Sequence, residues 1–144
     1  MRSYILAALV LATPFFAGSV ALAQERTPSA AGAEVYIISP KDGATVHNPV
    51  LVQFGLRGMG VAPAGMKFDN TGHHHLLIDT DPPSDLSTPL PATDKIVHFG
   101  KGQTETTLNL APGKHTLQLL FADANHIPHS PPVISQKITI TVKQ

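Results

Sequence analysis

Apolar residues beyond position 33 alternate with polar ones in several short segments. In residues 50–56 the apolar positions on one side are Val50, Val52, Phe54 and Leu56. Successive side chains of a β-strand point to opposite faces, so a period of two indicates strands with one buried face. We expect seven strands, at residues 35–38, 50–56, 73–79, 96–99, 104–110, 115–122 and 133–142.

Turn-forming residues separate these segments, and no helical period occurs between them. Ser39-Pro40-Lys41-Asp42-Gly43 follows the first segment, and Pro112-Gly113 precedes residues 115–122. Residues 80–91 contain too many prolines for a helix. Short strands at close intervals are typical of two packed sheets. We therefore predict an all-β fold, an immunoglobulin-like antiparallel Greek-key β-sandwich of about seven strands.

The first residues have the pattern of a secretory signal peptide. Arg2 precedes an apolar run at residues 4–12, and Ala21-Leu22-Ala23 forms a cleavage site of the A-x-A type. A membrane anchor is the alternative, but Pro14 and Gly18 interrupt the run. We expect a signal peptide at residues 1–23, a flexible leader at 24–33 and a single domain at 34–144.

The amino-acid composition limits the cellular compartment and the kinds of functional site that the protein can have. The chain has no cysteine, which suits export to a bacterial periplasm without disulfides. A blue-copper site, an iron–sulfur cluster and a cysteine nucleophile are excluded for the same reason. The 10 basic side chains balance the 10 acidic ones, so no nucleic-acid partner is expected. No second long apolar stretch follows residue 23, so we expect no membrane span after signal removal.

Three consecutive histidines open the third expected strand. If Leu76 and Ile78 face the core, the alternation turns His74 inward and places His73 and His75 together on the opposite face. Two imidazoles two residues apart on a strand can bind one Cu²⁺ or Zn²⁺ ion. In the alternative, the histidines only form hydrogen bonds with water or backbone.

The predicted topology brings further histidines to the same place. Residues 73–79 run antiparallel to 96–99 and to 115–122, so the start of the first and the ends of the other two share one end of the sandwich. The expected metal ligands are therefore His73, His75, His98, His126 and His129. This topology follows from apolar periodicity, independently of where the histidines occur.

Other polar or soft side chains are expected near this end. Asp69 and Asp123 could orient imidazoles through hydrogen bonds. Met59 and Met66 lie in the Gly-rich loop that leads to the histidines, where they supply copper ligands or fill gaps in packing. We expect His115, which follows Pro-Gly-Lys, to anchor backbone at a chain corner.

Several segments together resemble a known family. They are residues 38–44 (ISPKDGA), 72–79 (GHHHLLID), 98–105 (HFGKGQTE) and 112–119 (PGKHTLQL). In this combination the chain resembles the bacterial exported family called domain of unknown function 4399, over essentially all of the sequence after residue 23. The resemblance implies export and a small β-domain, and it brings no established activity.

Three classes of function remain open. The first is a periplasmic protein that binds a transition metal through the histidines, with copper favoured and zinc as the second choice. The second is a structural or recognition module of the cell envelope that contacts a protein partner and no metal. The third is a metal-dependent enzyme. No G-x-S-x-G elbow or phosphate-binding glycine loop is present, so we expect a binding protein before an enzyme and name no catalytic residue.

Overall fold

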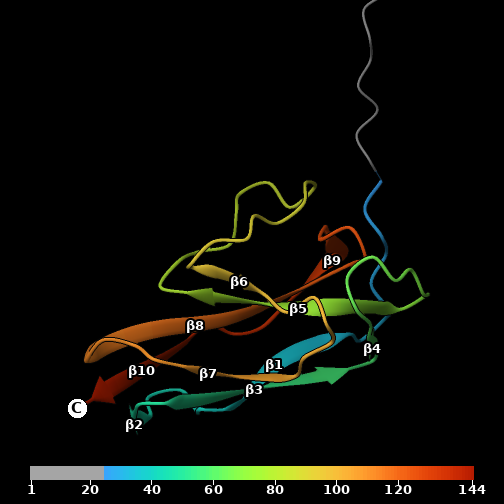
Figure 1. Ribbon diagram of the computed structural model, residues 1–144. Helices are drawn as coiled ribbons and strands as arrows, with labels where there is room; N and C mark the ends of the chain where they lie inside the picture. The colour runs from blue at the N-terminus through green and yellow to red at the C-terminus, as the bar shows by residue number, and fades with distance from the viewer. Residues whose placement is uncertain (1–24) are drawn as a thin grey trace, which may run out of the picture.

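The computed structural model describes residues 25–144, which form ten β-strands and no helix. The expected signal peptide at 1–23 lies outside the described residues. The strands are arranged in two layers that face each other (Figure 1). The predicted all-β sandwich is confirmed. The described part of the chain contains no helix that could cross a membrane.

The smaller layer has three antiparallel strands. They are β1 (Glu34–Ser39), β3 (Val50–Arg57) and β7 (Glu105–Leu108), in the order β1-β3-β7. Val50, Val52 and Phe54 of β3 are buried, whereas Leu51 is exposed. The alternation expected from the sequence therefore places the correct face of β3 inward.

The larger layer is centred on β5 (Thr71–Ile78) and β8 (Gly113–Ala122), which pair antiparallel. On the far side of β8 lies β10 (Ile138–Lys143), and β6 (Ile96–His98) pairs antiparallel with β5. The predicted antiparallel neighbours of residues 73–79 are thus the observed ones. His73 lies opposite Ala122 and His75 opposite His98, so the start of β5 meets the ends of β8 and β6.

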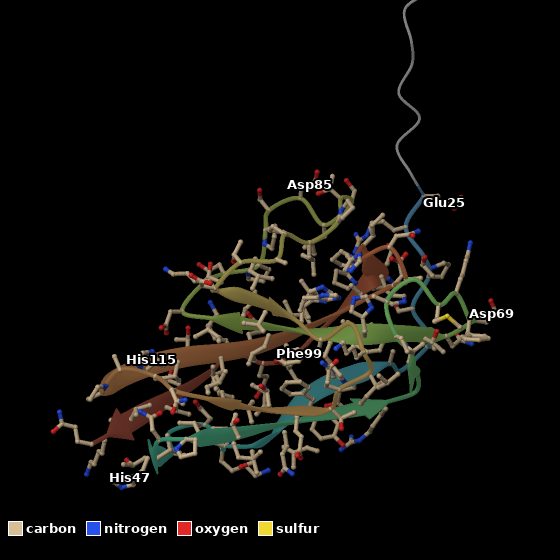
Figure 2. All side chains as sticks on the ribbon, in the orientation of Figure 1. Glu25, His47, Asp69, Asp85, Phe99 and His115 are labelled. Atoms are coloured by element: carbon tan, nitrogen blue, oxygen red, sulfur yellow. The ribbon has the colours of Figure 1, made fainter. Side chains whose placement is uncertain are left out.

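The core fills the space between the layers. It contains buried side chains from both sheets, chiefly Val52, Phe54, Leu76, Leu117, Leu119, Phe121 and Ile140. Phe99 lies between the two layers (Figure 2). Burying one such side chain stabilises the fold by about 1.5–3 kcal/mol, so the sandwich holds the start of β5 on a rigid support.

The last predicted strand is divided in two. Residues 133–142 were expected to be continuous, but β9 (Pro128–Ile134) ends before β10 begins. Ser135 lies at the break, where its hydroxyl accepts a hydrogen bond from the Leu119 N–H at 2.9 Å and donates to the Gln136 carbonyl at 2.8 Å. A serine side chain that takes over backbone hydrogen bonds interrupts the ladder.

Two short strands were absent from the sequence prediction. They are β2 (Thr45–His47), which pairs parallel with β10, and β4 (Gly60–Val61), which pairs parallel with β5. Strands of two or three residues are too short to show a period of two. Both lie at the edges of the larger layer.

A proline-rich loop covers the outer face of the larger layer. Leu90, with Leu86 beside it, packs on Leu77 and Leu120, apart from the main core. The loop arches over β6 and β5 (Figure 1). This cover explains why β5 is buried on both faces from Gly72 to Ile78, although one face points away from the sandwich core.

Candidate metal centre

The three consecutive histidines alternate between the two faces of β5 as predicted. His74 points into the core, with its ring centroid 5.1 Å from those of both Phe54 and Phe121. His73 and His75 lie on the opposite face, with ring centroids 4.8 Å apart. All three are fully buried or nearly so. The outer pair is therefore available to other groups that reach this face.

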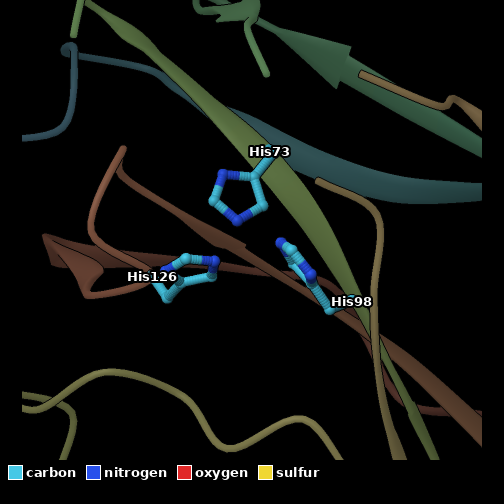
Figure 3. A group of neighbouring side chains, drawn as sticks. All are labelled: His73, His98 and His126. Carbon is cyan, nitrogen blue, oxygen red and sulfur yellow. The ribbon is translucent and has the colours of Figure 1, made fainter. Parts of the chain in front are cut away.

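Two further histidines meet His73 there. One ring nitrogen from each of His73, His98 and His126 lies within 4.8 Å of the others. The three rings point toward a common space from β5, from the end of β6 and from the loop after β8 (Figure 3). We call these three residues the histidine triad. Three segments far apart in the sequence supply it, as the predicted topology required.

His75 lies beside the triad. Its ring centroid is 5.2 Å from that of His98 and 6.1 Å from that of His126. The His73 ring is closer to His126, with the two centroids 5.0 Å apart. His75 is therefore a fourth imidazole that neighbours the triad.

The sharp turn between β8 and β9 positions His126. The Asp123 carboxylate accepts hydrogen bonds from the N–H groups of Asn125 and Ile127, at 2.9 and 3.0 Å, and the His126 N–H donates to the Asp123 carbonyl at 2.9 Å. His126 has a φ of 66°, in the left-handed region that costs a non-glycine residue roughly 1–2 kcal/mol. The turn therefore holds His126 in a conformation that the residue does not favour by itself.

Burial favours the neutral form of His73 and His98 and leaves several imidazole nitrogens near the triad without hydrogen-bond partners. Within residues 25–144, no group forms a hydrogen bond with either ring nitrogen of His73 or His75, or with Nε2 of His98. Burial, with added repulsion from His98 and His126, lowers the pKa of His73 from 6.5 to about 4. Burial likewise lowers the pKa of His98. Neutral imidazole is the form that binds a metal ion.

Burial also lowers the pKa of His75, to about 3, and repulsion from His73, His98 and His126 adds to the effect. Buried polar atoms normally have hydrogen-bond partners. A concentration of unpaired imidazole nitrogens in one small space is therefore unusual in a protein interior. A metal ion can satisfy several such nitrogens at once, because each neutral imidazole can coordinate it.

The arrangement is chemically suited to a transition metal. Imidazole is a good ligand for copper and zinc. A metal–nitrogen bond of about 2.0–2.1 Å places tetrahedral ligand atoms about 3.3 Å apart, so the widest separations in the triad would have to shorten. Rotation of His98 and His126, which are only half-buried, can provide that closure.

His129 was an expected ligand, but the structure does not place it with the triad. It is fully buried at the start of β9, its ring stacks on Phe121 at 5.8 Å, and its Nε2 donates to the Thr71 carbonyl at 3.2 Å. Phe121 belongs to the core face, where His74 also lies. His126 and His129 are thus directed to different faces of the same sheet.

The other residues expected near the metal have different contacts. Asp123 binds backbone of the turn and the Thr27 hydroxyl, with no hydrogen bond to an imidazole. Met59 packs against the main core. Asp69 and the exposed Met66 line an open cleft of about 380 Å³ beside residues 123–125. Met59 therefore fills space at the main core, and Met66 lies at the open cleft.

His115 and His47 lie at the opposite end of the molecule from Asp69 (Figure 2). His115 Nδ1 donates to the Asp79 carboxylate at 2.7 Å, and Nε2 donates to the Ala111 carbonyl at 2.8 Å. The hydrogen bond to Asp79 raises the pKa of His115. The predicted role of His115 as a backbone anchor at a chain corner is confirmed.

Gly100 allows the His98 ring to take its place. A Cβ atom at this position would overlap Cε1 and Nε2 of the His98 ring. Gly100 directly follows the strand expected at residues 96–99. Sequence gives no signal for this role, because the contact depends on the rotamer of a neighbouring side chain.

We expect Gly100→Ala to lower metal affinity by about 10-fold, within the range for residues that orient ligands, because the new methyl group displaces the His98 ring. Copper titration of the variant measures the effect. Gly60→Ala is the matched control, since its Cβ would meet only Thr71 Cγ2 at an ordinary 3.5 Å. Equal affinity in both variants would contradict the role of Gly100.

Comparison with known proteins gives one family match. A family model described as Domain of unknown function (DUF4399) matches residues 52–143, a range that contains the whole triad and His75. The resemblance noted from the sequence is confirmed. No curated protein and no solved structure matched the chain.

Proposed function

This chain belongs to the DUF4399 family, whose description assigns no activity, and we therefore propose its function from the site itself. The protein binds one transition-metal ion through His73, His98 and His126, with His75 as the nearest additional ligand. One observation carries the proposal: one nitrogen from each triad residue lies within 4.8 Å of the others. The unpaired state of the buried nitrogens of His73, His75 and His98 supports it.

Copper is the preferred ion. An all-imidazole set suits Cu²⁺ and Zn²⁺, and for a given nitrogen site the Irving–Williams order places Cu²⁺ above Zn²⁺. Calcium and magnesium prefer oxygen ligands, which the triad does not supply. The protein acts as a metal binder or carrier, because the three imidazoles of the triad are ligands for such an ion.

The protein works outside the cytoplasm, in the periplasm. The signal-like residues 1–23 and the lack of cysteine support this location. The mass of the protein recovered after expression with its full sequence tests it, because cleavage after Ala23 would leave Gln24 as the first residue. Recovery of the uncleaved chain from the cytoplasm would contradict export.

Titration of the purified, metal-stripped protein with Cu²⁺ and Zn²⁺ tests the binding proposal. We expect saturation near one equivalent, with copper bound more tightly than zinc, and nitrogen couplings from imidazole in the electron paramagnetic resonance spectrum of the copper form. His47→Ala is the control, because His47 is exposed and hydrogen bonds only to the Gln144 carbonyl. Copper binding that does not saturate, or that ranks below zinc, would contradict a copper site.

A further inference from the structure

Residues 26–29 lie against the turn that carries His126 and the chain just after it, although the sequence predicted a flexible leader at 24–33. Ser29 N–H donates to the Ser130 carbonyl at 3.1 Å, and Ser130 N–H donates to the Thr27 carbonyl at 3.0 Å. The Arg26 guanidinium donates to the carbonyls of Pro128 and His129. The segment thus forms specific contacts with the chain just after His126. We call residues 26–29 the N-terminal strap.

The strap also reaches the residue just before the His126 turn. The Thr27 hydroxyl donates to Oδ2 of Asp123 at 2.6 Å. Asp123 is largely buried, and its other oxygen, Oδ1, accepts the hydrogen bonds of Asn125 and Ile127 that close the turn. Thr27 therefore holds the carboxylate whose second oxygen shapes the turn.

The turn requires such support because of the backbone at its centre. His126 is one of three non-glycine residues with positive φ in residues 25–144. A non-glycine residue in that region persists only where surrounding contacts enforce it. The enforcing contacts come from Asp123 on one side and from the strap on both flanks.

We propose that Thr27 and Asp123 are positioning residues for the metal centre, through which the N-terminal strap holds His126 in the triad. The proposal rests on the proposed function and extends it. Neither residue supplies a ligand nitrogen, and Thr27 is about a hundred positions from His126 in the sequence. The segment that follows the expected cleavage site is thus part of the binding machinery.

Replacing Thr27 by valine tests this link, because valine keeps the shape of threonine and removes the hydroxyl. We expect Thr27→Val to lower Cu²⁺ affinity by about 10-fold, as for other groups that orient a metal ligand. Thr27→Ser, which keeps the hydroxyl, should restore affinity close to that of the unmodified protein. Thr80→Val is the matched control, because the same change there removes a hydroxyl outside the strap whose hydrogen bond is to the Asp81 carbonyl, at 3.4 Å.

A double-mutant cycle separates positioning from a general loss of stability. In a His126→Ala background the triad has already lost the ligand that the strap positions, so Thr27→Val should cause no further loss of affinity. An equal drop in both backgrounds would overturn the proposal. Unchanged affinity in Thr27→Val with His126 present would overturn it as well.

A second measurement tests the positioning role of Thr27 even if the protein binds no copper. Nuclear magnetic resonance of the metal-free protein should show that Thr27→Val shifts the ring signals of His126 and leaves those of His47 unchanged. Absence of copper binding in the unmodified protein would refute the proposed function alone. Unaltered His126 signals in Thr27→Val would refute the positioning role.

Discussion

Replacing any one member of the triad by alanine is expected to lower Cu²⁺ affinity by well over 10-fold, since losses of about 10-fold or more follow even from changes around a ligand. Each of His73, His98 and His126 supplies one of the three nitrogens that lie together. Isothermal titration of the three variants measures the change. The metal-free forms of His98→Ala and His126→Ala should unfold at nearly the same denaturant concentration as the unmodified protein, because both side chains are half-buried.

His129→Ala is the sharpest control for the triad variants. Its side chain is fully buried against Phe121, so its loss should reduce the free energy of unfolding by at least about 2 kcal/mol and leave copper affinity almost unchanged. The opposite result, a strong loss of affinity for His129→Ala and none for His126→Ala, would show that the two residues exchange places around the metal. The copper affinity of His75→Ala then shows the number of ligands. A loss as large as that of the triad variants would indicate four ligands, and a small loss would indicate three.

Acid should destabilise the metal-free protein strongly between about pH 6.5 and pH 4. Burial lowers the pKa of His74 to about 4, and the pKa values of His73 and His75 lie at about 4 and 3. In this range the unfolded chain binds protons that the folded protein excludes, so stability falls as the pH falls. A shift from 6.5 to about 4 corresponds to roughly 3 kcal/mol for His74 alone, a large share of a typical total of about 5–15 kcal/mol.

Urea unfolding at several pH values measures this loss. His74→Leu is the informative variant, because leucine can fill much of the space between Phe54 and Phe121 without a proton-binding group. The variant should lose less stability than the unmodified protein between pH 7 and pH 4.5. A urea midpoint that stayed constant over this range in the unmodified protein would contradict the buried, neutral state of the three histidines.

Acidification has an opposite effect at the other end of the sandwich. The raised pKa of His115 stabilises the fold below about pH 6.5, and that contribution is lost as the pH rises through the raised value. His115 is partly exposed, so solvent screening makes this contribution small. The three buried histidines therefore determine the direction of the overall pH dependence.

The sequence by itself determined the longer strands and the two faces of β5. A period of two is a local property, because each residue of a strand turns its side chain by the same rule. Because Leu76 and Ile78 face the core, His74 lies on the core face of β5 and His73 lies on the opposite face. The expected pairing of strands also follows from the apolar segments, and it alone brings His98 and His126 near His73.

Only the tertiary structure shows which of His126 and His129 lies at the triad. They lie three positions apart in a segment with no apolar period, so no local rule assigns their directions. The positive φ of His126 and the start of β9 at Pro128 turn one ring to the triad and the other to Phe121. Those backbone conformations depend on the hydrogen bonds that the Asp123 carboxylate accepts from the turn and from the hydroxyl of Thr27, which is 96 positions away from Asp123. Contacts between residues so far apart depend on the packing of the whole sandwich. The local sequence pattern therefore could not predict them.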